Sequence, residues 1–237
     1  MPKADENEQR GSRRMCFRGR GFTLIELLVV IGVIALLIGI LLPVLSSAKQ
    51  EAIAIACGSN LRQMGIGLAV YSNDYRERGP FAGAVIDWDQ RDPDTDNPPW
   101  MQQLDVYMEN QEFFSGCGAY PAEGGPYHYF LSSRAEAEFN RARGAAGIDV
   151  RGSVEGRMIR FPSAFVAVGD NQLATFASVD ADKDNYTFQC VFGTGPAYWE
   201  PHHRGTINLL FADAHVARFS GFEADSMTFR YSEMSAF

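Results

Sequence analysis

Hydrophobic residues occupy almost every position from Leu24 to Leu45, and only Glu26, two glycines and Pro43 interrupt the run. About twenty apolar residues are the length that an α-helix needs to cross a bilayer. A carboxylate inside such a helix costs about 2.5–3.5 kcal/mol on insertion scales, so Glu26 is expected to have a partner. The run predicts a membrane-spanning helix with one acidic residue near its start.

The helical pattern continues beyond Pro43 as one apolar stripe. Its members follow each other in alternating steps of four and three: Cys57, Leu61, Met64, Leu68, Tyr71 and Tyr75. This spacing puts them on one face of an amphipathic helix, which we expect to pack on the core of the head. Glycines at 58, 65 and 67 weaken the helix by up to about 1 kcal/mol each, so bending is plausible. We expect one helix from Phe22 to about Tyr75, on the order of 80 Å long.

The middle of the chain predicts loops and two short helices. Residues 76–99 are rich in Gly, Pro and Asp, which favours turns, and residues 113–130 are also rich in turn-forming types. Residues 100–110 and 132–143 have helical patterns. Ser132 or Ser133 is the candidate N-cap of the second helix and Gly144 its candidate end.

From Met158 onward the pattern is typical of strands. We predict a strand at 165–168, an alternating strand at 186–192, and two strands within 206–219 joined at Asp213 and Ala214. Helices followed by strands predict an α+β protein, in which the long helix packs on a head with a mainly antiparallel sheet.

The residues Arg20-Gly21-Phe22-Thr23-Leu24-Ile25-Glu26 open the apolar run. They resemble the cleavage and methylation motif of type IV prepilins and type II secretion pseudopilins. The resemblance implies cleavage after Gly21 and N-methylation of Phe22 by the prepilin peptidase/N-methyltransferase. Glu26 becomes the fifth mature residue, and its implied partner is the amine of Phe22 on a neighbouring subunit. Pro43 becomes the twenty-second, where these helices commonly carry a kink-forming proline.

A plain secretory signal peptide fits this region less well. Its apolar core is 7–15 residues long and its cleavage site lies beyond that core. Here the run is longer and the candidate cut precedes it. The expected organisation is a cytoplasmic leader at 1–21, a transmembrane and assembly helix at 22–45, its amphipathic continuation at 46–75, and an extracytoplasmic head at 76–237.

The charge distribution agrees with this organisation. The formal net charge is −8, and residues 1–21 hold six basic and three acidic residues of the 21 basic and 29 acidic in the chain. Subtraction leaves 15 basic and 26 acidic residues after the leader, a net charge of −11. A basic leader and an acidic body predict a single-pass protein with its leader in the cytoplasm and its head outside. The resemblance implies that the membrane is the bacterial inner membrane and that the head lies in the periplasm. The acidic body argues against nucleic-acid binding.

A second resemblance lies near the C-terminus. His203 and Asp213 are separated by nine residues, as in the H-x9-DG segment that accompanies prepilin-type N-termini in large sets of bacterial paralogues. Ala214 stands where that segment has glycine. A tight hairpin often needs positive φ at this position, so alanine there costs about 1 kcal/mol or requires a different turn.

Two kinds of metal site are candidates. His202, His203, Asp213, His215 and Asp170 could bind zinc or another transition metal, but we favour a structural His–Asp hydrogen bond, with Asp213 accepting from turn amides. Two runs of alternating carboxylates, Asp92/Asp94/Asp96 and Asp180/Asp182/Asp184, could bind calcium, and a solvated acidic loop is the favoured alternative for each. The resemblance offers a precedent, because major pseudopilins often hold calcium in a loop of the head. Of the two runs we prefer the one at Asp180, Asp182 and Asp184, because this segment lies between predicted strands.

Cysteine usage predicts one disulfide in the mature chain. Cys16 leaves with the leader, and Cys57, Cys117 and Cys190 remain in an oxidising compartment. The resemblance implies the pair Cys57–Cys117, while Cys190 alternates with phenylalanines and is interpreted as a core thiol.

These observations favour a structural subunit, with no enzymatic activity. We expect a pseudopilin-like protein that assembles through its N-terminal helix with other pilin or pseudopilin subunits into a type II secretion or type IV pilus-like filament. The alternative is a membrane-anchored extracytoplasmic binding or adhesion protein that does not polymerise, with a metal-dependent head as one form of it.

Overall fold

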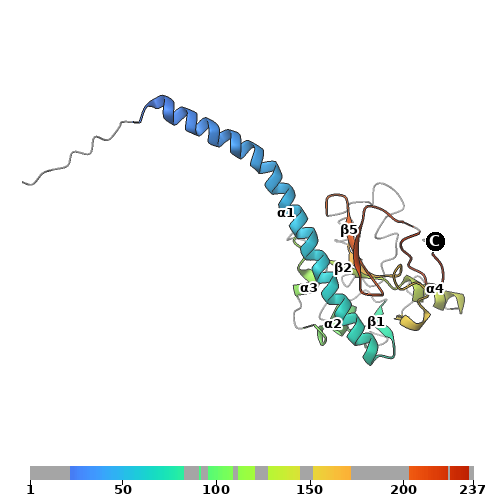
Figure 1. Cartoon of the computed structure of the whole chain (residues 1–237). Coiled ribbons are helices and arrows are strands. Elements are labelled where there is room, and N and C mark those ends of the chain that lie inside the picture. The colour runs from blue at the N-terminus through green and yellow to red at the C-terminus, as the bar shows by residue number, and fades with distance from the viewer. Residues whose placement is uncertain are drawn as a thin grey trace, which may run out of the picture. The chain divides into compact units, whose positions relative to one another are not determined.

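The structure is a computed structural model that describes residues 22–82, 91, 96–108, 112–120, 128–144, 152–171, 203–223 and 225–234. The chain divides into two compact units, Met1–Leu45 and Ser46–Phe237. One α-helix, α1 (Leu24–Asp74), runs through both units (Figure 1). The predicted strand at 186–192 lies outside the described residues.

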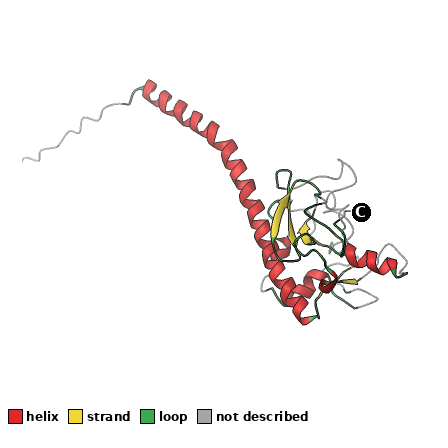
Figure 2. Ribbon diagram, turned by 45° about the vertical axis from the view of Figure 1, so that its right-hand side comes forward, coloured by secondary structure: helices red, strands yellow, loops and turns green. Residues whose placement is uncertain are grey.

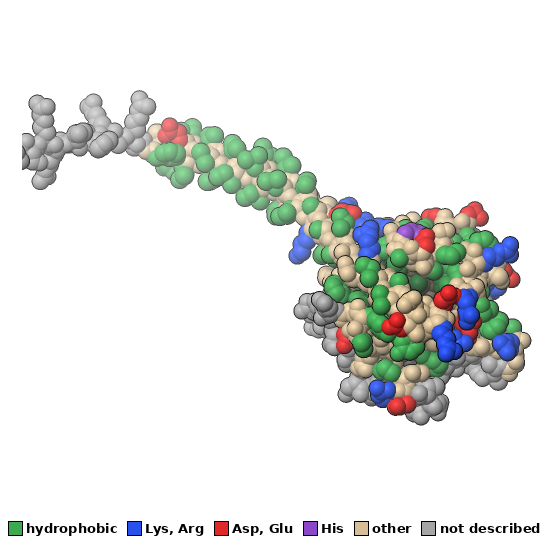
Figure 3. Space-filling model, turned by 60° about the horizontal axis from the view of Figure 1, so that its bottom comes forward, with side chains coloured by type: hydrophobic (Ala, Val, Ile, Leu, Met, Phe, Trp, Pro, Cys, Tyr) green, Lys and Arg blue, Asp and Glu red, His purple; other side chains and the backbone are tan. Residues whose placement is uncertain are grey.

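In the first unit, every described side chain is exposed. Figure 3 shows hydrophobic side chains over the visible face of this part of α1. By length and composition α1 can cross a membrane, and Pro43 lies inside it. An exposed helix of this composition suggests a membrane anchor.

The second unit contains two antiparallel sheets and short helices (Figure 2). The larger sheet has the order β2-β4-β5-β6, with bounds Tyr129–Leu131, Val166–Asp170, Ile207–Phe211 and Val216–Phe219. The smaller pairs β1 (Arg78–Ala82) with β3 (Gly152–Glu155). The helices are α2 (Trp100–Asp105), α3 (Glu112–Ser115), α4 (Arg134–Ala142) and the 3-10 helix η1 (Gly156–Met158).

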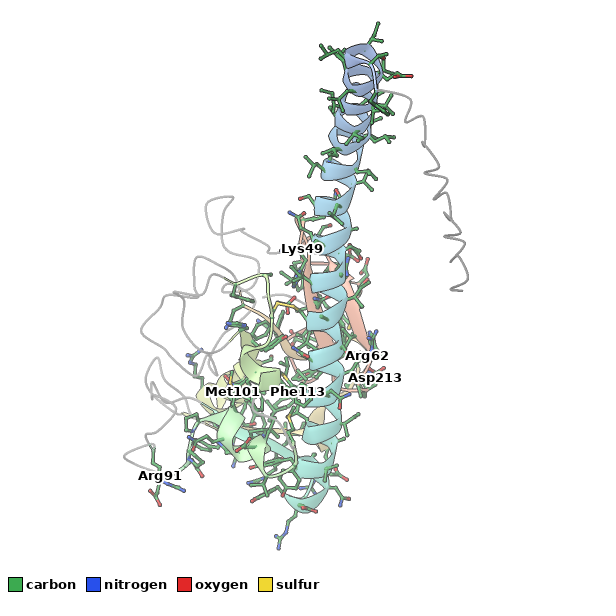
Figure 4. The ribbon with its side chains drawn as sticks, turned by 90° about the vertical axis from the view of Figure 1, so that its left-hand side faces the viewer. Lys49, Arg62, Arg91, Met101, Phe113 and Asp213 are labelled. Carbon is green, nitrogen blue, oxygen red and sulfur yellow. A yellow bond between two sulfur atoms is a disulfide. The ribbon has the colours of Figure 1, made fainter. Side chains whose placement is uncertain are left out.

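The apolar stripe of α1 packs on the head as predicted. Cys57, Leu61, Met64 and Tyr71 are buried and belong to the main core cluster, and Leu68 is partly buried against it. The same cluster contains Trp100, Phe114, Tyr129, Val168 and Leu210. In Figure 4, Met101 of α2 and Asp213 of the β5–β6 turn lie on opposite sides of α1. The helix and sheets therefore form an α+β head around one face of α1.

Tyr75 departs from the predicted stripe. Its side chain is 52% exposed, although its ring stacks on that of Tyr71 with centroids 4.2 Å apart. The helix ends one residue earlier, at Asp74, so Tyr75 stands at the end of the stripe and is only partly covered by the head.

The loop prediction for residues 76–99 is wrong at β1. This strand contains Gly79 and Pro80, two residue types that are rare in strands, so its sequence indicates a turn. It forms because it pairs with β3, 70 or more positions later in the chain. The predicted turn-rich stretch likewise contains α3 and β2. The strand predicted at 165–168 begins one residue later and extends to Asp170.

The ends of the short helices are also corrected. The helix expected at 100–110 stops at Asp105. Ser133 is at the N-cap of α4, but its side chain makes no capping hydrogen bond. Gly144, with φ 96°, directly follows the C-cap residue Arg143, as expected for a glycine that ends a helix.

The hairpin β5–β6 has a three-residue loop. Phe211 N–H donates to His215 O at 2.9 Å, and Ala214 N–H donates to Phe211 O at 2.9 Å. Ala214 has φ 69°, the left-handed conformation that completes this type of loop. The predicted junction at Asp213 and Ala214 is confirmed, and alanine adopts the conformation that usually needs glycine.

Candidate functional site

The start of α1 is capped by three reciprocal hydrogen bonds between Thr23 and Glu26. Thr23 donates to Glu26 Oε2 twice, from its backbone N–H at 2.9 Å and from its hydroxyl at 2.8 Å. Glu26 N–H donates to Thr23 Oγ1 at 3.3 Å. This is a capping box, which satisfies backbone donors at a helix start. Glu26 therefore has a partner within its own chain, which the Thr-x-x-Glu spacing predicts and which our sequence analysis missed.

The head contains a buried polar network at the edge of β4 and β5. Asp170 Oδ2 accepts hydrogen bonds from Asn208 N–H at 2.7 Å and from Asn208 Nδ2 at 2.9 Å. His203 Nε2 lies 3.1 Å from the same oxygen. Asn208 Nδ2 also donates to Ala54 O of α1 at 3.2 Å. The network therefore ties the long helix to the sheet through groups that are almost fully inaccessible to water.

The loop before β5 positions His203. Its N–H and that of Thr206 each donate to the other residue's carbonyl oxygen, both at 3.2 Å. Arg204 has φ 55° and Gly205 has φ 86° between them, as in a type I′ turn. The tight turn fixes the histidine beside Asp170, which the sequence placed 33 positions away.

A disulfide lies next to this network. Cys57 of α1 and Cys117, which follows α3, are bonded with an S–S distance of 2.12 Å and a Cα–Cα distance of 5.1 Å. This is the pairing that the resemblance implies. Both cysteines are buried, and Cys117 Sγ lies 3.7 Å from His203 Nε2. Sulfur, imidazole and carboxylate thus meet at one place in the core.

Asp213 belongs to a different, exposed pair. Its Oδ1 accepts from His215 N–H at 3.2 Å and lies 2.5 Å from His215 Nδ1. Burial alone would raise the pKa of Asp213, but the hydrogen bonds from His215 lower it overall. Asp213 follows β5 whereas His203 precedes it, so the two motif residues lie at opposite ends of this strand. The structure thus divides the predicted His/Asp set, placing His203 with Asp170 and Asp213 with His215.

The remaining predicted ligands mostly lie outside the described residues. This applies to His202, to Asp92 and Asp94, and to the calcium candidates Asp180, Asp182 and Asp184. Cys190, predicted to be a core thiol, also lies outside the described residues. Asp96 is described, and its exposed carboxylate lies 3.8 Å from Arg91. The calcium hypothesis therefore stays a prediction.

A mostly apolar cavity of about 360 Å³ opens between α1, the small sheet and the large sheet. Ser132 lines it, and the buried Ser132 Oγ has no hydrogen-bond partner among the described residues. Concave apolar sites with a few polar groups are typical ligand pockets. Its other lining residues include Leu68, Pro80, Val154, Ile159, Phe165 and Leu210.

Residues 16–42 match the family model of the prokaryotic N-terminal methylation motif. The chain carries a prepilin-type methylation motif. The matched residues contain Gly21, Phe22, Thr23 and Glu26, so the capping box lies inside the motif. Comparisons with curated proteins and with solved structures give no match. The motif supports a prepilin-like protein of the type IV pilin and pseudopilin type. The H-x9-DG resemblance, based on His203 and Asp213, stays a prediction from the sequence.

Proposed function

We propose that this chain is a pseudopilin-like structural subunit that is cleaved after Gly21, N-methylated on Phe22 and assembled into a type II secretion or type IV pilus-like filament. The observation that carries the proposal is the methylation motif at residues 16–42, which leads directly into an exposed apolar helix. Such a helix needs apolar surroundings, which a bilayer supplies before assembly and neighbouring helices supply after it.

Topology follows from charge and from the position of the motif. The basic leader stays in the cytoplasm, and the acidic head lies in the periplasm. The partners are the prepilin peptidase/N-methyltransferase, the inner membrane and other pilin or pseudopilin subunits. The subunit acts mechanically, through helix packing, and its head presents the variable surface.

Glu26 has a defined part in this assembly. In the separate subunit its carboxylate accepts from Thr23 within the capping box. In the filament the same carboxylate neutralises the terminal amine of Phe22 on a neighbour, because a buried charge requires a counter-charge. Pro43 lies inside α1 and provides the site at which the packed helix can bend.

The first experiment is to determine the N-terminus of the protein made in its own host. Mass spectrometry of strains with and without the prepilin peptidase should find a chain that starts at N-methylated Phe22 only when the enzyme is present. A chain that retains residues 1–21 in both strains would make the proposal wrong and reduce α1 to a membrane anchor.

The alternative is a membrane-anchored binding protein that does not polymerise, and the apolar cavity of the head favours it. Three variants separate the two functions. Glu26→Ala and Glu26→Gln both remove the charge, while Thr23→Ala keeps it and removes the capping hydroxyl. A filament subunit should be processed in all three and fail to crosslink to its neighbours when Glu26 is changed. A solitary anchor should lose nothing in any of them.

A further inference from the structure

Four ligand atoms converge beside α1, and they come from four separate segments. The sulfur atoms of Cys57 and Cys117 and a ring nitrogen of His203 lie within 4.8 Å of one another. Asp170 Oδ2 is 3.1 Å from His203 Nε2. All four residues are buried, with exposed fractions of 3% or less. Thiolate, imidazole and carboxylate are the ligand types that zinc prefers.

We propose that, when the disulfide is open, Cys57, Cys117, His203 and Asp170 bind one tetrahedral divalent metal ion of the zinc class. This inference goes beyond the proposed function and does not depend on it. The ion would lie between His203 Nε2, Cys117 Sγ and Asp170 Oδ2, and His203 would bind it through Nε2.

Two of the distances between the ligand atoms are close to those of a tetrahedral site. Zinc–sulfur bonds of about 2.3 Å and zinc–nitrogen or zinc–oxygen bonds of about 2.0–2.1 Å imply roughly 3.6 Å between sulfur and nitrogen and roughly 3.3 Å between nitrogen and oxygen. The corresponding distances are 3.7 Å and 3.1 Å. The two sulfur atoms must separate to roughly 3.8 Å, which requires that the S–S bond is broken and that the two side chains move apart.

The surroundings of Asp170 support a ligand role. Asn208 holds its Oδ2 with two hydrogen bonds, as outer-shell partners hold the carboxylates that bind metals. Its other oxygen, Oδ1, is buried and has no hydrogen-bond partner among the described residues. A buried carboxylate that is not fully hydrogen-bonded costs free energy, and a cation bound at Oδ2 offsets part of that cost through its charge.

Disulfide and metal site exclude each other. A dithiol reductant transfers two electrons to the S–S bond, which becomes two thiols while the dithiol closes to its own disulfide. Metal binding then releases the thiol protons. A disulfide oxidant reverses the exchange and frees the ion. The head is therefore crosslinked through sulfur in an oxidising compartment and through the metal in a reducing one.

The test uses the full chain in detergent micelles. After anaerobic reduction and removal of the reductant, Co²⁺ should give a thiolate-to-cobalt band and visible bands of tetrahedral intensity. Zn²⁺ should bind at one ion per reduced chain and raise its melting temperature. The oxidised chain should show none of these signals. A reduced chain that binds no Co²⁺, or that binds Zn²⁺ without a rise in melting temperature, would overturn the proposal.

Variants identify the ligands. His203→Gln should weaken Co²⁺ binding by at least about tenfold, while His215→Gln, at the exposed histidine, should leave it unchanged. Cys190→Ser should keep the thiolate-to-cobalt band, and the Cys57→Ser/Cys117→Ser double variant should lose it. Equal spectra for His203→Gln and the unchanged chain would show that the thiols bind the ion without the core site, which contradicts the proposal.

Discussion

At the residue scale, Ala214 holds a left-handed conformation that a side chain makes costly. Its φ of 69° closes the β5–β6 loop, at the position where the H-x9-DG segment that this stretch resembles has glycine. A non-glycine residue in this conformation destabilises the folded state by about 1–2 kcal/mol, which glycine would avoid. Glycine also increases the conformational entropy of the unfolded chain, which offsets part of this stabilisation. We expect Ala214→Gly to raise the free energy of unfolding by up to about 1 kcal/mol, measured by thermal unfolding of the full chain in detergent.

Ala217 in β6 supplies the matched control. It is a strand residue that pairs with Leu209, and it packs partly buried against a hydrophobic cluster. Ala217→Gly removes a packed methyl group and adds chain entropy, so it should lower the melting temperature. If Ala214→Gly lowered it too, the strain assigned to the loop would be contradicted.

At the element scale, Gly169 sets how closely β4 packs against its neighbours. A Cβ atom at this position would lie 2.5 Å from Leu209 Cδ2 and 2.5 Å from Phe130 Cε1. Both neighbours lie on strands that flank β4, and both are fully buried. Gly169→Ala therefore forces the sheet to shift and should destabilise the protein by about 1–3 kcal/mol.

Two other glycines test this explanation. A Cβ at Gly58 of α1 would meet nothing closer than 3.5 Å, so Gly58→Ala should raise the melting temperature through helix propensity. A Cβ at Gly221 would meet nothing within 4 Å, and Gly221→Ala should be near neutral. Equal effects at all three positions would show that packing does not distinguish them.

The elements differ in how well the sequence predicts them, and the difference is physical. The helix α1 is set by local periodicity, so both its apolar run and its buried stripe were predictable. The small sheet was not, because β1 contains glycine and proline and forms through a partner far along the chain. For His203 the sequence listed Asp170 among several candidate partners, but it did not indicate Cys117, which comes from a distant segment and is brought close by packing.

At the scale of the whole molecule, buried tyrosines make the folded state sensitive to alkaline pH. Burial, and then the neighbouring Tyr75 and Tyr107, raise the pKa of Tyr71 to about 12. Burial also raises the pKa values of Tyr120 and Tyr129. The folded state then binds more protons than the unfolded state above pH 10, so stability is complete below about pH 10 and falls as the pH rises toward 12.

Melting temperatures measured between pH 8 and 12 test this dependence, with tyrosinate absorbance recorded on the same samples. Tyr71→Phe loses a hydrogen bond to Gln103, so it should melt lower at pH 8. Its melting temperature should then fall less steeply with pH, because one titrating group is gone. An equally steep fall in the variant would rule out a contribution from Tyr71.

The disulfide between α1 and the region after α3 contributes to the free energy of unfolding of the head. It closes a segment with a sequence separation of 60 residues between α1 and the region after α3. In the chain-entropy model, a loop of this length stabilises the folded state by about 4 kcal/mol. Replacing both cysteines, as Cys57→Ala/Cys117→Ala, should therefore lower the free energy of unfolding by up to about 4 kcal/mol. Urea unfolding of the full chain in a chelating buffer measures the loss without any contribution from bound metal.

The state of Cys190 tests whether the lost stability comes from the Cys57–Cys117 disulfide. Non-reducing peptide mapping should find Cys57 joined to Cys117 and Cys190 open to alkylation, and Cys190→Ala should keep the stability conferred by the crosslink. If mapping found Cys190 bridged, the pairing would be wrong, and the cysteines could no longer supply both the crosslink and the metal ligands. If the pairing is found and the double variant loses stability, the same two residues fasten the head to the helix that carries the methylation motif.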